Sequence, residues 1–421
     1  MRALVLHPVR KGADGRDPRD ALAEAVSLAE ALDLDVAGAE VVPLAKARAG
    51  TLFGKGKIEE LTAMVGEREA GLVVIDGVVS PVQQRNLEKL WKAKVLDRTG
   101  LILEIFGERA QTREGVLQVE LAHLSYQKSR LVRSWTHLER QRGGFGFLGG
   151  PGETQIEADR RALDERILKI KQALGKVVKT RGQHRAARKR LGAPVVALVG
   201  YTNAGKSTLF NRLTGSGVLA KDMLFATLDP TMRAIALPDG SRAILSDTVG
   251  FISDLPTQLV AAFRATLEEV VEADLILHVR DIAHAESQIQ AENVRAVLAD
   301  LGVGRDEERV IELWNKVDLL PPDKAEALRQ VAARTPRVAV VSALTGEGVP
   351  ELMRLVAAEV EEPRTDETLK LAFGQGRQRA WLFDHRLVRS ELPTDDGYEL
   401  AVRWTERERS QYLALGRGQG A

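Results

Sequence analysis

Short apolar runs alternate with helical patterns through the first 108 residues or so. Amphipathic helices are predicted over about 18–32 and 57–66, and a third begins at Ser80-Pro81, an N-cap followed by a first-turn proline. Buried strands that alternate with helices predict a small parallel α/β unit, which we place at 1–112 and call the N-terminal unit. The runs that read as strands are 3–6, 36–42, 72–75 and 94–96.

The pattern changes to two long helices over 113–192. Apolar residues recur there at steps of three, four and seven, which is a heptad seam and predicts an antiparallel helical hairpin. The seam residues are Leu117, Leu121, Leu124, Leu131, Trp135 and Leu138 in the first helix, and Ile156, Leu163, Ile167, Ile170, Leu174 and Val177 in the second.

Two segments of this hairpin have unusual composition. The tip, 143–152, holds six glycines together with Phe145, Phe147 and Leu148. A flexible linker would favour Ser over such apolar side chains, so we favour a tip that contacts a partner. The basic run, 176–190, contains seven Lys or Arg and no acidic residue, which indicates either nucleic-acid contact or a solvated helix face.

A phosphate-binding motif follows the apolar run 194–199 and precedes a helical segment. Its glycines let backbone N–H groups face phosphates, Lys206 would reach the β and γ oxygens, and Ser207 would ligate Mg²⁺. We therefore expect a nucleotide-binding G domain over 193–362. The matching residues are Gly200, Tyr201, Thr202, Asn203, Ala204, Gly205, Lys206, Ser207 and Thr208.

Three further motifs follow at the intervals of a P-loop GTPase. Asp247-Thr248-Val249-Gly250 places Asp247 near Mg²⁺ and the Gly250 N–H near the γ-phosphate. In Asn315-Lys316-Val317-Asp318 the Asp318 carboxylate can accept two hydrogens from guanine, a pair that adenine lacks. In Ser342-Ala343-Leu344 the Ala343 N–H is suited to the guanine 6-oxo group. Together these motifs predict GTP as substrate, GDP as product and Mg²⁺ as cofactor.

The segment between the P-loop and Asp247 is expected to sense the γ-phosphate. Thr227 is the chosen second hydroxyl ligand of Mg²⁺, and Thr231 is the alternative. The nucleotide-contacting residues predicted here are Phe225, Ala226, Thr227, Leu228 and Asp229.

Many GTPases place a glutamine after the glycine of this motif to orient the attacking water. Here Phe251 follows Gly250, and its side chain cannot hydrogen-bond a water. We expect slow intrinsic hydrolysis, with Lys206, Thr227 and Gly250 as catalytic residues. Further stabilisation of transition-state charge must come from a partner, a monovalent cation or another residue. Asn203 either helps a K⁺ ion to sit beside the phosphates or only shapes the loop.

The stretches GYTNAGKSTLFNRL, FATLDPT, DTVGFI and NKVD resemble the HflX branch of the Obg-HflX GTPases. LDRTGLILEIFGERAQTREGVLQVELAHLSY and RGGFGFLGGPGETQIEADRR are similar to the segments that precede the GTPase domain in that family. The resemblance covers residues 1 to about 362. It implies a GTPase that binds the large ribosomal subunit and its rRNA, and that in some members splits stalled ribosomes. A hydrophobic residue after DTVG, here Phe251, also fits this group.

The last segment, 363–421, is predicted to form a small α+β domain. Strands are expected at 369–373, 387–392 and 398–404, helices near 377–385 and 405–415, and a hairpin turn at Asp395-Asp396-Gly397.

Composition narrows the remaining choices. Sixty Lys and Arg against 59 Asp and Glu exclude a protein that binds polyanions through net charge alone, and 44% hydrophobic residues indicate a globular core. The absence of Cys excludes thiol chemistry and disulfides. No apolar stretch has the length of a membrane span or secretory signal, so we expect a cytoplasmic protein that is monomeric when free.

Two other functions stay open at this point. One is an RNA remodeller whose N-terminal unit binds nucleotide through Thr51-Leu52-Phe53-Gly54-Lys55-Gly56-Lys57, an imperfect phosphate-loop pattern that more simply predicts a turn and helix start. The other is a GTP-gated scaffold that uses the hairpin tip as a protein interface.

Overall fold

The structure is a computed structural model that describes residues 1–10, 16–141, 151–191, 193–215, 225, 231–253, 267–304, 307–361 and 364–417. The N-terminal unit is a parallel sheet in the order β2-β1-β3-β4. Its strands are β1 (Arg2–Arg10), β2 (Asp35–Leu44), β3 (Leu72–Ile75) and β4 (Lys94–Asp97), and its helices are α1 (Pro18–Glu30), α2 (Lys55–Glu67), α3 (Pro81–Trp91) and α4 (Arg98–Arg109). The four predicted strands are confirmed, whereas α4 was not identified from the sequence.

The predicted helix start at Ser80 is confirmed by a reciprocal capping box. The Ser80 hydroxyl accepts from the Gln83 N–H (3.2 Å), and the Gln83 side chain accepts from the Ser80 N–H (2.8 Å). This arrangement satisfies two donors that the first turn of a helix otherwise leaves without partners.

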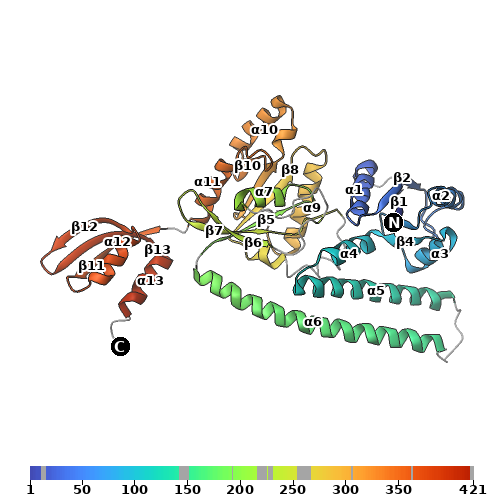
Figure 1. The fold of residues 1–421 in the computed structure, drawn as a ribbon, viewed down its shortest axis with the longest axis horizontal. Helices are drawn as coiled ribbons and strands as arrows, with labels where there is room; N and C mark the ends of the chain where they lie inside the picture. The colour runs from blue at the N-terminus through green and yellow to red at the C-terminus, as the bar shows by residue number, and fades with distance from the viewer. Residues whose placement is uncertain are drawn as a thin grey trace.

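Two long antiparallel helices, α5 (Arg113–Gln141) and α6 (Pro151–Leu191), form the predicted hairpin. Figure 1 shows α5 lying between α6 and the N-terminal unit. Arg166 on α6 donates to Glu120 on α5 at 2.6 Å, and Lys128 pairs with Asp164. Ile170 of the predicted seam is buried, while Leu168, off the seam, is 57% exposed. The heptad interpretation is therefore confirmed for these turns.

A six-stranded sheet in the order β10-β9-β8-β5-β7-β6 carries the G-domain motifs, and only the edge strand β6 is antiparallel. The strands are β5 (Val195–Gly200), β6 (Thr231–Ala236), β7 (Arg242–Asp247), β8 (Leu275–Asp281), β9 (Val310–Asn315) and β10 (Val338–Val340). The α-helices described here are α7 (Lys206–Thr214), α9 (Ser287–Asp300), α10 (Pro322–Arg334) and α11 (Val349–Val360), and a 3₁₀ helix, η1 (Val317–Leu319), follows β9. This is the predicted α/β P-loop fold.

The C-terminal segment folds as an antiparallel sheet, β11-β13-β12, with two helices, as predicted. Thr394 pairs with Gly397, so Asp395 and Asp396 form the hairpin loop. Figure 1 shows this sheet at the opposite end of the molecule from the N-terminal unit. Its elements are β11 (Arg364–Ala372), α12 (Gly376–Asp384), β12 (Val388–Thr394), β13 (Gly397–Thr405) and α13 (Glu406–Arg417).

Most of the hairpin tip lies outside the described residues. The basic run continues α6, and the side chains of Lys176 and Lys179 within it are exposed. The domain boundaries placed at 112, 192 and 362 remain predictions. None of the helices in the described ranges is both long and apolar enough to cross a membrane.

One hydrophobic core joins the N-terminal unit to the G domain. Leu101 and Phe106 of α4 belong to the same buried cluster as Val199 of β5, Phe225 and Phe251. The rings of Phe106 and Phe225 meet edge to face with centroids 4.6 Å apart. The two units therefore bury apolar surface against each other beside the P-loop.

Asp97 fastens α5 to the N-terminal sheet. Its carboxylate caps α4 by accepting from the Gly100 N–H (2.8 Å), and it also accepts from the Tyr126 hydroxyl (2.7 Å) and the Arg130 guanidinium (3.0 Å). Its side chain is 4% exposed.

We predict that Asp97→Ala lowers the free energy of unfolding by about 2–4 kcal/mol, because it leaves Arg130 without its buried counter-charge.

Urea unfolding followed by circular dichroism measures this loss. Asp17→Ala is the matched control, because Asp17 also caps a helix, α1, but at an exposed position, where about 1 kcal/mol is expected. Equal losses in the two variants would contradict the role given to Asp97.

Candidate guanine-nucleotide site

The P-loop connects β5 to α7 in a conformation that its sequence explains. Gly205 has φ +94°, and a Cβ there would collide with the side-chain amide of Asn315, so only glycine fits. Asn203 has φ +58°, a left-handed conformation that Asn adopts more readily than most residues. Its side chain is exposed. The loop therefore turns sharply while its Asn203 amide faces outward.

Lys206 lies folded into this loop. It is 6% exposed, and its Nζ donates to the carbonyls of Gly200 (3.1 Å) and Tyr201 (2.7 Å). Burial lowers the pKa of Lys206 to about 8, against the opposing effect of the Asp247 carboxylate. A phosphate would supply this buried ammonium with a stronger acceptor than the two carbonyls.

Ser207 and Asp247 form an oxygen pair beside the lysine. The Ser207 hydroxyl donates to Asp247 Oδ2 at 2.8 Å, and Asp247 is fully buried at the end of β7. A hydroxyl and a carboxylate are the hard oxygen ligands that Mg²⁺ prefers, so the pair fits this cation. The neighbouring Thr248 hydroxyl donates to the Leu198 carbonyl at 2.6 Å, so its role is structural.

The segment after Asp247 is hydrogen-bonded to the P-loop through its backbone. The Phe251 N–H donates to the Gly200 carbonyl (3.1 Å), and the Thr202 N–H donates to the Phe251 carbonyl (2.7 Å). Val249 and Phe251 are buried in the core. The Phe251 ring therefore belongs to the hydrophobic core. A Cβ added to Gly250 would lie 3.1 Å from Lys206 Nζ.

The guanine motifs meet at the ends of β9 and β10. Asn315 links the two halves of the site, because it donates to the Ala204 carbonyl (2.7 Å) and accepts from the Ala343 N–H (2.9 Å). A guanine 6-oxo group would have to share or replace that second bond. Lys316 pairs with Asp281 at 2.8 Å. The structure thus brings the P-loop and both base motifs together.

The remaining residues of these motifs differ in exposure. Asp318 and Leu344 are exposed and accessible to a base, whereas Val317 and Ser342 are buried. The Ser342 hydroxyl accepts from the Thr345 N–H at 3.0 Å and so shapes the loop. Thr208, the last residue of the P-loop motif, is half-buried on α7.

Comparison with known proteins places the chain in a family. Residues 19–107, 109–188, 195–316 and 327–420 match the family models described as GTP-binding GTPase N-terminal, GTP-binding GTPase Middle Region, 50S ribosome-binding GTPase and HflX C-terminal domain. GTPase HflX of Magnetococcus marinus is 50% identical over 95% of this chain and 90% of its own. The chain belongs to the HflX family. It is a P-loop GTPase that binds and hydrolyses GTP.

Two further proteins are similar to this chain. GTPase HflX of Escherichia coli is 46% identical over 82% of this chain and 80% of its own. A solved GTP-binding protein from Sulfolobus solfataricus in complex with GDP is 22% identical over 86% of this chain and 99% of its own, with a TM-score of 0.46.

Part of the predicted γ-phosphate sensor lies outside the described residues of this HflX protein: Ala226, Thr227, Leu228 and Asp229. Phe225 is described and 2% exposed, with its ring on Phe106, so only its backbone is available to a nucleotide. Thr231 begins β6 opposite Asp247. The choice between Thr227 and Thr231 stays a prediction.

In the imperfect phosphate-loop pattern of the N-terminal unit, 51–57, the Lys57 side chain is engaged in ion pairs. Lys57 contacts Glu40 and lies 2.7 Å from Glu60, and Lys55 begins α2. The turn and helix start predicted for this segment is confirmed.

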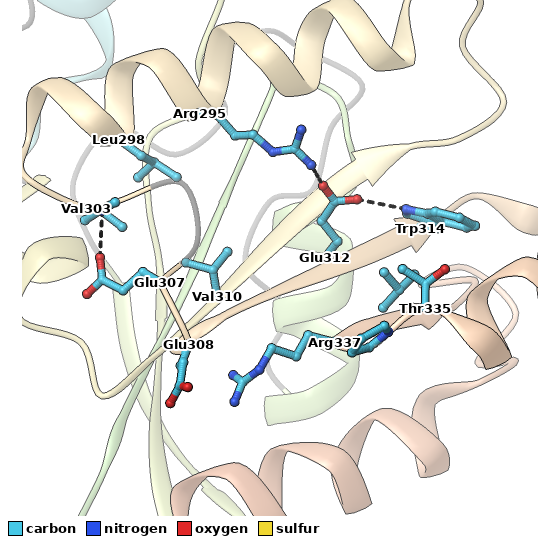
Figure 2. A pocket seen from close by; sticks show the side chains of 13 residues that line it. Arg295, Leu298, Val303, Glu307, Glu308, Val310, Glu312, Trp314, Thr335 and Arg337 are labelled. Atoms are coloured by element: carbon cyan, nitrogen blue, oxygen red, sulfur yellow. Dashed lines mark hydrogen bonds and ion pairs between the residues drawn. The ribbon is translucent and has the colours of Figure 1, made fainter.

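A cavity of about 420 Å³ lies between α9 and the β9–β10 edge, lined by none of the nucleotide motifs. Figure 2 shows Glu312 at its wall, contacting Arg295 and accepting from the Trp314 indole at 3.0 Å. Arg280 also donates to Glu312 at 2.8 Å. The cavity has no assigned role in the reaction.

Arg212 was not predicted from the sequence, yet it hydrogen-bonds to the guanine loop, 342–344. Its Nε donates to the Ala343 carbonyl at 2.6 Å and its Nη2 to the Leu344 carbonyl. A Cβ on Gly346 would lie 2.7 Å from its Nη1. Helix α7 thus carries Lys206 at its start and this anchor near its end. No local pattern marks Arg212, because its partners lie about 130 positions away.

We predict that Arg212→Ala weakens GDP and GTP binding about tenfold and equally, because losing both hydrogen bonds loosens the base loop without touching the phosphate loop. Isothermal titration calorimetry with each nucleotide measures the effect. The control is Arg354→Ala, which removes an exposed arginine of α11 paired with Glu351 at 2.6 Å. Affinities within twofold of the wild type would show that Arg212 does not hold the base loop.

Proposed function

We propose that this HflX protein is a Mg²⁺-dependent GTPase whose effector is the large ribosomal subunit and its rRNA, and that the ribosome stimulates hydrolysis. The observation that carries the proposal is Phe251, which is buried where a water-orienting side chain would be needed. The stabilisation of transition-state charge that Phe251 cannot give has to come from elsewhere, here from a partner together with a K⁺ ion. Residues 195–316 of this chain match the family model described as 50S ribosome-binding GTPase, and this similarity supports the ribosome as that partner.

The site residues are assigned in the same proposal. Lys206 and the Gly250 N–H stabilise the γ-phosphate, Ser207 ligates Mg²⁺ directly, and Asp247 holds the ion through its water shell. Thr227 supplies the second hydroxyl. Asp318 selects guanine through two hydrogen bonds, since an unpaired carboxylate would disfavour adenine.

Hydrolysis of GTP by the purified protein with Mg²⁺ and K⁺, alone and with purified large subunits, tests this function. We expect the subunits to raise kcat at least tenfold, since one group that stabilises transition-state charge is worth about 10³-fold or more, while ATP is not hydrolysed. Unchanged kcat in the presence of subunits, with GTP still tightly bound, would move the effector away from the ribosome.

Rescue of stalled ribosomes is the finer part of the proposal. Intact ribosomes incubated with the protein and a non-hydrolysable GTP analogue should separate into subunits on a sucrose gradient. Binding to the large subunit without separation would limit the function to subunit association.

K⁺ is proposed as a further cofactor through Asn203, whose side chain is exposed in the P-loop. We predict faster turnover in K⁺ than in Na⁺ buffer at equal ionic strength. Asn203→Gly should abolish the difference without disturbing the loop, because glycine readily adopts the φ of +58° found there. Equal rates in the two buffers for the wild-type protein would end this proposal.

A further inference from the structure

Thr202, the third residue of the P-loop motif, carries a buried hydroxyl without a hydrogen-bond partner. The residue is 7% exposed, and its Oγ1 has no donor or acceptor within reach in the part of the chain that the structure describes. Such groups are uncommon, because burying a hydroxyl without a partner costs free energy. The nearby hydroxyls of Ser207 and Thr248 donate to Asp247 and to the Leu198 carbonyl. The Thr202 hydroxyl therefore needs an explanation that these two do not.

The backbone holds Thr202 beside the position where many GTPases carry their glutamine. The Thr202 N–H donates to the carbonyl of Phe251 at 2.7 Å, and Phe251 occupies that position here. Because the Phe251 ring belongs to the hydrophobic core, the position itself offers no polar side chain to the reaction. Thr202 brings a hydroxyl to the residue that is one backbone hydrogen bond away.

The two residues that the motifs assign to the γ-phosphate, Gly250 and Lys206, are immediate neighbours of the Thr202 side chain. A Cβ at Gly250 would meet the Thr202 methyl at 2.8 Å and Lys206 Nζ at 3.1 Å. The Thr202 hydroxyl shares its Cβ with that methyl, so it lies at the same junction. Because Lys206 is covered to the same degree, at 6% exposed, a phosphate that reaches this lysine also reaches the residue next to it.

We propose that Thr202 is a catalytic residue of this GTPase, and that its hydroxyl donates a hydrogen bond to a γ-phosphoryl oxygen. GTP then supplies the acceptor that the surrounding protein does not provide, whereas GDP, without a γ-phosphate, leaves the hydroxyl unpaired. A charged acceptor makes this hydrogen bond stronger than one between neutral groups. The inference rests on the GTPase activity and not on the ribosome.

The hydroxyl acts on the charge that the reaction spreads over the γ-phosphoryl group. The oxygen of a water bonds to the γ-phosphorus while the bond to the β–γ bridging oxygen breaks, and the electron pair of that bond stays on GDP. The water gives up one proton, which the released phosphate or the solvent takes up. Negative charge lies on the γ oxygens in the transition state, where a fixed donor lowers the barrier. Thr202 supplies such a donor and keeps its own proton.

Thr202→Val tests the proposal, because it replaces the hydroxyl by a methyl group of nearly the same volume. Single-turnover hydrolysis of γ-labelled GTP by the purified full chain with Mg²⁺ and K⁺, without ribosomal subunits, gives the rate constant. We expect it to fall about ten- to 100-fold, which corresponds to one lost hydrogen bond to a charged group, while the GDP affinity measured by calorimetry stays within twofold. Thr202→Ser keeps the hydroxyl and should retain the rate within threefold.

Two further measurements on Thr202→Val separate a catalytic role from a structural one. Because the hydroxyl has no partner in the protein, its removal breaks no hydrogen bond, and the thermal midpoint of unfolding should be unchanged or higher. The ratio of the rates in K⁺ and Na⁺ buffers should equal that of the wild type, since the K⁺ ion is assigned to Asn203. A lower midpoint together with weaker GDP binding, or a changed ratio, would assign the loss of rate to the fold or to the K⁺ site and would overturn the proposal.

Ser287→Ala is the matched control. Ser287, the first residue of α9, is likewise 7% exposed, and its hydroxyl also has no partner among the described residues, but it belongs to none of the nucleotide motifs. Removing this hydroxyl should leave the rate unchanged. A rate within twofold of the wild type in Thr202→Val, or equal losses in Thr202→Val and Thr202→Ser, would show that the Thr202 hydroxyl takes no part in the reaction.

Discussion

The contact between the N-terminal unit and the G domain governs the rest of this structure. Buried charges are costly unless each has a partner. Glu24 and Arg98 pair with each other, and they also hydrogen-bond to Tyr201 and Ser253 on the other side of the junction. The Phe106–Phe225 contact adds apolar burial beside them. Because both sets of contacts end on nucleotide motifs, the N-terminal unit cannot shift without disturbing the site.

The nucleotide site itself depends on side chains that link separate loops. Asn315 bridges the P-loop and the guanine loop through two hydrogen bonds. Arg212 anchors the same guanine loop to α7, whose first residue is Lys206. The phosphate-binding and base-binding loops are therefore joined by side-chain hydrogen bonds. Residue 205 has to be glycine because the Asn315 amide lies against it and leaves no space for a Cβ.

The absence of a polar side chain after Gly250 separates this GTPase from those that orient water themselves. Phe251 contributes to the core instead, so its burial adds to stability while it leaves the reaction short of a catalytic group.

The sequence by itself determined the strands, the heptad seam and the P-loop motifs, because each is a local periodicity or spacing that neighbouring residues impose on the backbone. It also marked Phe251 as a side chain that cannot hydrogen-bond a water. Only the tertiary structure decided where side chains point. Tyr201 and Phe225 read as nucleotide contacts, yet their rings are buried at the junction with the N-terminal unit. Glu24 meets Tyr201 from 177 positions away, and no pattern of neighbours encodes a contact made by the packing of two units.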